Sequence, residues 1–327
     1  MCTSASAPPR RRPDVAGPQR SAPDPRLVSG FEAALPAMLD DIERLVTTES
    51  PSSDLAAVAR CAEVVAALGT ERLGAEPEFL VRDGVTHLRW RLGSGPRRVL
   101  LLGHHDTVWP SGTLATRPYE VRDGVLRGPG CYDMKTGLAM AFHALAALDD
   151  VDGVTLLVTG DEELGSPSSR ELIESEAAGC AAALVLEGAA AGGALKTARK
   201  GVSRYEVQLR GRAAHAGLEP ERGVNAAVEA AHQILAVTAL ANPADGTTVT
   251  PTVLSAGTTT NTVPAQGGFA VDVRVADAAE QSRVDRAIRA LRPVLDGAGI
   301  EITGGPNRPP LQATASTALF HRARELA

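Results

Sequence analysis

The feature that most constrains the fold is the apolar run Val99–Leu102, which leads directly into the polar segment GHHDTV. An uninterrupted apolar run of this kind is typical of a buried strand. Alternate residues of an extended chain share a face, so we expect His104 and Asp106 on one side and His105 on the other. A metal-binding histidine is usually oriented through its second ring nitrogen, and Asp106 is placed to do this. Taken alone, the segment also fits an ordinary histidine at a strand end.

Three further acidic sites lie at the ends of apolar runs. They are Asp133 in RGPGCYDMKTG, the pair Glu162 and Glu163 in TGDEELGS, and Glu187 in ALVLEG. The carboxyl ends of strands in an open α/β sheet converge on one crevice, so these residues are predicted to gather there. Clustered carboxylates need a cation, and one histidine with several carboxylates suits zinc, with cobalt and manganese as alternatives. An acidic run such as DEE alone fits a solvated turn, but the surrounding glycines and apolar strands weaken that interpretation.

The predicted elements divide the chain into two kinds of domain. Residues 27–199 alternate helices with apolar strands, which indicates an α/β domain with a mostly parallel sheet covered on both faces. Residues 200–305 contain strands with alternating polarity, in the order strand, helix, two strands, helix, strand. That order is typical of a ferredoxin-like α+β fold with an antiparallel sheet. Its second helix is predicted at residues 279–295.

Composition limits the partners and the setting. The net charge of -6 and the aromatic content of 3% argue against nucleic acid as a partner. The four cysteines lack C-x-x-C spacing, which favours a reducing, cytoplasmic setting. No apolar run reaches the length of a membrane span, so no membrane association is predicted. Residues 1–26, rich in Pro, Ser, Ala and Arg, are predicted to be a disordered leader.

Four segments resemble, in order, the motifs of the M20 family of metallopeptidases. GHHDTV resembles the family's G-H-x-D-T/V segment, GPGCYDMKTG its G-x-G-x-x-D-x-K-G segment, GDEELGS its D-E-E segment, and LEG its strand-end acid. The resemblance runs from about residue 49 to the end of the chain, and an ordered set of motifs is far more specific than a single one. It implies a zinc-peptidase-like catalytic domain with an inserted dimerisation, or lid, domain at residues 200–305. It also implies a homodimer.

The resemblance implies a metal-binding role for four residues. His104 and Glu187 would bind one zinc ion, Glu163 would bind a second, and Asp133 would bridge the two. A complete chain would then hold two zinc ions per subunit.

The resemblance also separates the roles of two neighbouring acids, which spacing alone does not. Glu162 would be the general base that takes a proton from water, while Glu163 is a ligand and Asp106 orients His104. The implied reaction is hydrolysis of an amide or peptide bond next to a carboxylate-bearing residue, as in a glutamate carboxypeptidase-like exopeptidase. An aminoacylase or desuccinylase acting on N-acyl amino acids is the alternative.

Three residues of the second domain are candidates for substrate binding. His215 in GRAAHAG resembles the family's lid histidine, which reaches the active site of the partner subunit, and Asn261 in TNTVP resembles its N-x-I/V-P segment. Arg274 in VDVRV offers a planar, permanently charged fork for a carboxylate, although a surface arginine on a strand fits equally well. The remaining strand and helix histidines, without acidic company, are interpreted as packing residues: His87, His143 and His232.

The chain departs from the family pattern after the second domain. Family members return to the catalytic domain with glycine-rich segments and a late histidine that completes the second zinc site. Residues 306–327 are predicted to be the truncated start of this return, and His321 lacks glycine-rich surroundings. We therefore expect little activity from this 327-residue form. The alternative to an enzyme is a non-catalytic remnant that dimerises or binds peptide.

Overall fold

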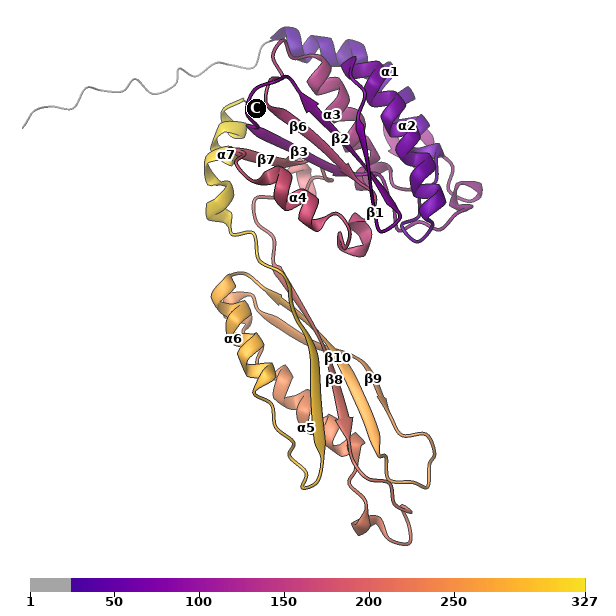
Figure 1. Ribbon diagram of the computed structural model, residues 1–327, viewed down its shortest axis with the longest axis vertical. Coiled ribbons are helices and arrows are strands. Elements are labelled where there is room, and N and C mark those ends of the chain that lie inside the picture. The colour runs from indigo at the N-terminus through magenta and orange to yellow at the C-terminus, as the bar shows by residue number, and fades with distance from the viewer. Residues whose placement is uncertain (1–24, 327) are drawn as a thin grey trace, which may run out of the picture. The chain divides into compact units, whose positions relative to one another are not determined.

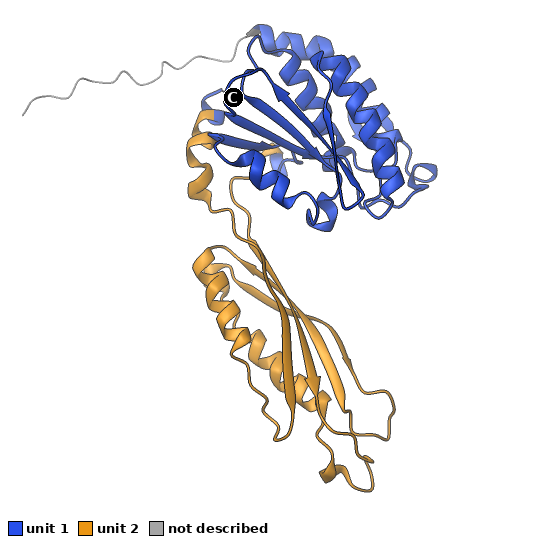
Figure 2. Cartoon of the chain, viewed as in Figure 1, with its two compact units in different colours: residues 1–192, 323–327 blue, residues 193–322 orange. Residues whose placement is uncertain are grey.

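The computed structural model describes residues 25–326 and contains two compact units (Figure 1). One unit comprises residues 1–192 and 323–327, and the other residues 193–322 (Figure 2). The predicted leader lies outside the described residues, except for its last two, which belong to helix α1 (Pro25–Thr47). Among the helices of the described part, none has the length and apolar character needed to cross a bilayer.

The first unit contains a five-stranded sheet with the order β1-β2-β6-β3-β7. Strand β3 is parallel to both of its neighbours, β6 and β7, whereas β1 and β2 are antiparallel to the strands beside them. This arrangement confirms the predicted α/β class. The strands are β1 (Glu78–Arg82), β2 (Val85–Leu92), β3 (Val99–His104), β6 (Val154–Thr159) and β7 (Ala182–Val185), and a separate hairpin pairs β4 (Glu120–Arg122) with β5 (Val125–Arg127).

Helices cover both faces of this sheet, as continuous apolar strands require. The helices are α1, α2 (Leu55–Leu73), α3 (Thr136–Ala146) and α4 (Arg170–Ala177). Helices α1, α2 and α3 pack together on one face, and α4 lies across the other (Figure 1). The two faces of strand β2 meet different helices. Leu88 and Trp90 enter the core on one face, while Arg89 and Arg91 on the other face bind Glu176 of α4.

The core of this unit is centred on Trp90. Its ring meets that of Phe142 edge-on, with ring centroids 5.6 Å apart, and its Nε1 donates to the Ala75 carbonyl at 3.0 Å. A side chain at position 69 would place a Cβ 2.3 Å from the Trp90 ring, so only glycine lets α2 approach β2 this closely. Asp54 caps α2 by accepting from the Ala57 amide at 3.0 Å.

The second unit is a four-stranded antiparallel sheet with the order β11-β8-β10-β9. Its elements follow the predicted sequence of strand, helix, two strands, helix and strand. They are β8 (Gly201–Arg210), α5 (Ala226–Thr238), β9 (Thr248–Ala256), β10 (Gln266–Val275), α6 (Ala278–Arg289) and β11 (Gly299–Arg308). The alternation predicted for β8 is confirmed, since Tyr205, Val207 and Leu209 are buried. A last helix, α7 (Ala313–Leu326), follows β11.

Helix α6 is shorter than the sequence predicts, ending at Arg289 instead of residue 295. Pro293 has no amide hydrogen and disfavours a helical residue before it, so the apolar spacing beyond Arg289 does not continue the helix. The segment is held instead by the buried carboxylate of Glu229 in α5. This carboxylate accepts from the amides of Val294 at 3.0 Å and Leu295 at 2.8 Å.

Glu229→Ala is expected to lower the free energy of unfolding by about 3 kcal/mol, because it leaves those amides without an acceptor in the interior. Burial raises the pKa of Glu229, but the hydrogen bonds from Gln233 and the two amides outweigh it and hold the pKa below its usual value. The stabilisation that the ionised Glu229 gives to the folded state is therefore complete at neutral pH. It is lost as the pH falls through the folded-state pKa of Glu229. Urea titration of this variant and of the exposed control Glu221→Ala measures the difference; equal losses would contradict this account.

Candidate metal centre

His104 lies at the carboxyl end of β3 with only 1% of its surface exposed. Its Nδ1 lies 3.0 Å from the backbone carbonyl oxygen of Asp106 and 3.3 Å from the Asp106 carboxylate. A hydrogen on Nδ1 is therefore satisfied, and Nε2 faces Asp133 Oδ1 at 3.1 Å and Glu187 Oε1 at 3.4 Å. This orientation presents Nε2 to a cluster of acids.

The fully buried carboxylate of Asp106 links three segments of the chain. It accepts from the hydroxyl of Ser52 at 2.6 Å and from the backbone amides of Glu162 at 3.1 Å and Glu163 at 3.2 Å. Burial raises the pKa of Asp106, but hydrogen bonds from His104 and Ser52 lower it, and the net shift is downward. The residue thus stays ionised while it holds the end of β3 against the turn that follows β6.

His105 points away from this cluster, as strand alternation predicts. Its Nε2 lies 3.1 Å from the carbonyl oxygen of Thr86, and the residue is completely buried. The Ser50 hydroxyl donates to the His105 carbonyl at 2.6 Å. His105 therefore belongs to the support of the site rather than to its open side.

Two other segments bring Asp133 and Glu187 to His104. Buried Lys135 anchors the Asp133 turn by donating from Nζ to the carbonyls of Leu45 at 2.8 Å and Thr48 at 2.7 Å. At Gly137, a Cβ would lie 2.0 Å from the backbone oxygen of the residue before Glu187. Glycine there allows the start of α3 to contact the segment that carries Glu187.

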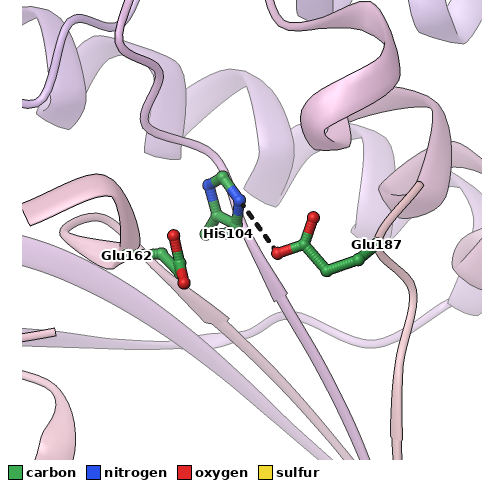
Figure 3. A group of neighbouring side chains, drawn as sticks. All are labelled: His104, Glu162 and Glu187. Atoms are coloured by element: carbon green, nitrogen blue, oxygen red, sulfur yellow. Dashed lines mark ion pairs between the residues drawn. The ribbon is translucent and has the colours of Figure 1, made fainter. Parts of the chain in front are cut away.

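The four predicted ligands and Glu162 form two overlapping groups around His104. His104, Glu162 and Glu187 form one group, seen in Figure 3, and His104, Asp133 and Glu163 form the other. Within each group one ligand atom per residue lies within 4.8 Å of the others. Glu162 thus falls in the same group as the predicted ligands, so membership of a group alone does not separate base from ligand.

The electrostatics of the cluster suit a bound cation. Burial and the neighbouring Asp133 carboxylate raise the pKa of Glu163 to about 7. Burial lowers the pKa of His104, but its hydrogen bonds to Asp106, Asp133 and Glu187 outweigh this and raise it to about 12. The His104 shift reflects acids that favour positive charge on the ring, and the Glu163 shift reflects a position where a further negative charge is unfavourable. An imidazole nitrogen among carboxylate oxygens is also a donor set that zinc accepts.

The second unit brings two of its three candidate residues together. His215 and Thr262 form a β-bridge, and the Ala216 amide donates to the Asn261 carbonyl at 2.9 Å. Arg274 lies near the other end of β10, where its Nε and Nη2 donate to Asp272 at 2.7 Å and 3.1 Å. The Nε and Nη2 edge of the Arg274 guanidinium, predicted to bind a substrate carboxylate, is thus already hydrogen-bonded to Asp272.

Two histidines interpreted as packing residues do have acidic company, which corrects that interpretation. His143 Nε2 lies 2.8 Å from the buried carboxylate of Asp41, and His87 is linked through Ser168 to Asp161. Spacing could not reveal these links, because the partners lie on distant segments. Ser52, which binds Asp106, was also missed, and no local pattern in the sequence marks it.

A histidine and carboxylates gathered at the carboxyl ends of α/β strands are the arrangement that metal-dependent hydrolases use to hold their ions. The sequence pattern of Peptidase family M20/M25/M40 matches residues 100–289, and the chain belongs to this family. It is 33% identical over 295 residues to carboxypeptidase G2 of Pseudomonas sp. (strain RS-16), covering 84% of this chain and 71% of that protein.

Solved structures show the same fold. The aminopeptidase PepT of Bacillus cereus matches with a TM-score of 0.64 and 20% identity, covering 88% of this chain and 77% of that one. A Bacillus subtilis protein described as a dinuclear metal binding peptidase of the M20 family matches with a TM-score of 0.55 and 14% identity, covering 90% and 82%. At these identities the likeness concerns the fold.

Asp106→Asn is expected to weaken zinc binding by about 10- to 100-fold, because its amide nitrogen cannot accept: in place of Oδ2 it loses the bonds from Ser52 and the Glu163 amide, and in place of Oδ1 the bond from the Glu162 amide. Zinc affinity measured by competition with a chelator tests this. The exposed acid Asp123 supplies the control, Asp123→Asn, which is expected to bind zinc like the parent chain. Parent-like affinity in Asp106→Asn would show that Asp106 does not organise the site.

Proposed function

We propose that the chain is a zinc-dependent hydrolase that cleaves an amide or peptide bond next to a carboxylate-bearing residue, as a glutamate carboxypeptidase-like exopeptidase. The observation that carries this proposal is the set of carboxylates around His104 Nε2, with Asp106 holding both His104 and the Glu162–Glu163 turn. Family membership and the similarity to carboxypeptidase G2 support the same reaction class.

In this proposal four residues would hold zinc, with two ions per subunit in a complete chain. His104 and Glu187 would bind one ion, Glu163 would bind the second, and Asp133 would serve both. The short distances from His104 Nε2 to Asp133 and Glu187 support the first set, and the raised pKa of Glu163 supports a cation near it. When bound, zinc makes water more acidic and stabilises negative charge developing on the substrate carbonyl. Cobalt and manganese accept similar ligands.

Glu162 is the general base in this proposal. Its amide is held by Asp106 Oδ1, and its carboxylate belongs to the group around His104. From there it takes a proton from the attacking water and later passes a proton to the leaving amine. Asp106 acts on the reaction only through the groups that it positions.

Substrate binding is assigned to His215, Asn261 and Arg274 of the second unit. His215 Nδ1 accepts from the amides of Gly217 and Leu218, both at 3.1 Å, so a neutral ring carries its hydrogen on Nε2. This exposed Nε2–H is available to a carbonyl oxygen of the substrate. In the proposed homodimer, His215 serves the partner's site, and Asn261 is a further substrate-binding residue. Arg274 binds the substrate carboxylate in exchange for part of its contact with Asp272.

The proposed substrates are small peptides and N-acyl amino acids, acted on in the cytoplasm. Within the described residues, Cys61, Cys131 and Cys180 are free thiols, which supports a reducing setting. The aminoacylase- or desuccinylase-type alternative shares every residue of the site and differs in the acyl group accepted. A panel of N-acyl-glutamates, folate-like amides, N-acetyl and N-succinyl amino acids and dipeptides separates these substrate classes.

Glu162→Gln is expected to lower kcat by about 10²- to 10⁴-fold while the zinc content stays that of the parent, because the amide keeps the shape of the acid but cannot take a proton. Turnover on the preferred substrate of the panel and zinc content by elemental analysis are the two measurements. Glu171→Gln, in an exposed position on α4, is the matched control.

Two results would contradict the proposal. A zinc-loaded complete chain that hydrolyses no amide in the panel would exclude the enzyme and favour a non-catalytic chain that dimerises or binds peptide. Undiminished turnover in Glu162→Gln would exclude Glu162 as the base.

A further inference from the structure

A chain of hydrogen bonds lies beside the turn that carries Glu162 and Glu163. The Gly160 amide donates to His87 Nδ1 at 3.2 Å, and His87 Nε2 lies 3.2 Å from the Ser168 hydroxyl oxygen. The Ser168 hydroxyl in turn lies 2.7 Å from Asp161 Oδ2. His87 comes from β2, so the chain joins this strand to both ends of the turn.

The donor and acceptor of every hydrogen bond from Gly160 through His87 and Ser168 to Asp161 can be assigned. A backbone amide only donates, so His87 Nδ1 must be an unprotonated acceptor. A neutral ring then carries its hydrogen on Nε2 and donates to Ser168, whose own hydrogen is left for the Asp161 carboxylate. His87 is completely buried, and burial lowers its pKa, which agrees with a neutral ring. Only one tautomer of His87 satisfies all the partners.

Asp161, near the start of the turn, is hydrogen-bonded to Ser168 and Ser169 at its end. Its buried carboxylate accepts from the amide and hydroxyl of Ser168, both at 2.7 Å, and from those of Ser169 at 3.2 Å and 2.5 Å. Ser169 also provides the carbonyl that accepts the Ile173 amide in the first turn of α4. Asp161 is therefore bound to the start of α4, and the residue that follows it is Glu162.

Two buried carboxylates thus hold the same short segment. Asp106 binds the amides of Glu162 and Glu163 from β3, while Asp161 and its serines hold the preceding residue. A rotation of the backbone at Asp161 would move both glutamates together, and a displacement of 1 Å at a reacting group costs on the order of 10²-fold in rate. Asp106 binds only the backbone amides of the two glutamates, so Asp161 and its serines add a second, independent anchor at the residue that precedes them.

We propose that His87, Ser168 and Asp161 are positioning residues that set the place of the Glu162 and Glu163 carboxylates. None of the three touches the substrate or the metal in this role. The inference rests on the proposed function for what the two glutamates do. It goes beyond that proposal in assigning their placement to a tautomer-specific link from β2.

The first test uses the metal-free chain and does not depend on catalysis. Nitrogen-15 NMR of histidine side chains is expected to show His87 as a neutral ring with hydrogen on Nε2, and His87→Gln identifies its signals. Ser168→Ala should shift both ring nitrogens, because it removes the acceptor of the Nε2–H. A hydrogen on Nδ1, a charged ring, or signals unaffected by Ser168→Ala would overturn the proposal.

The second test compares Ser168→Ala, Ser168→Thr and the control Ser166→Ala. Ser168→Ala is expected to lower kcat by about 10- to 100-fold with KM within twofold of the parent, and to weaken zinc binding in the same range. Ser168→Thr restores the hydroxyl and should recover most of both losses, while Ser166→Ala should cause neither. Equal effects in the two alanine variants, or no recovery with threonine, would overturn the proposal.

The two proposals fail in distinguishable ways. A complete chain without amide hydrolysis removes the proposed function, yet the tautomer of His87 and the zinc affinities of the serine variants still decide whether these hydrogen bonds position the glutamates. A hydrolytically active parent whose His87 has the other tautomer removes only the positioning proposal.

Discussion

The buried carboxylate of Asp106 is the interaction on which the site depends. It lies at the end of β3, faces the ring of His104, and accepts from the amides of Glu162 and Glu163 after β6. Parallel pairing of β3 with β6 brings these strand ends together, and the carboxylate then fixes their spacing. Apolar burial determines the sheet, but one ionised group in its interior determines where the reactive side chains lie.

Charge explains why this arrangement needs a cation. Several carboxylates surround the single imidazole of His104, whose Nε2 lies 3.1 Å from Asp133 and 3.4 Å from Glu187. The protein stabilises positive charge there, as the raised pKa of His104 and that of Glu163 show. A divalent ion supplies that positive charge while the general base stays unprotonated. Metal-assisted hydrolysis requires both conditions.

The sequence predicted the parts of this protein that depend on local patterns. Apolar runs ending in acids identified the residues now grouped around His104, and the α/β and ferredoxin-like orders followed from periodicity. Contacts between distant segments could not be predicted in this way. Helix α6 ends early because of Pro293 and the bonds from α5, and the link from His87 to Asp161 spans β2 and the turn after β6.

The most direct test of the account is a crystal structure of the zinc-loaded chain with anomalous data collected at the zinc edge. The account predicts an anomalous peak about 2.0–2.1 Å from His104 Nε2, with carboxylate oxygens of Asp133 and Glu187 at about 2.0–2.2 Å and Asp106 outside the ligand set. A peak bound by His105 or by Asp106, or no peak beside His104, would contradict it.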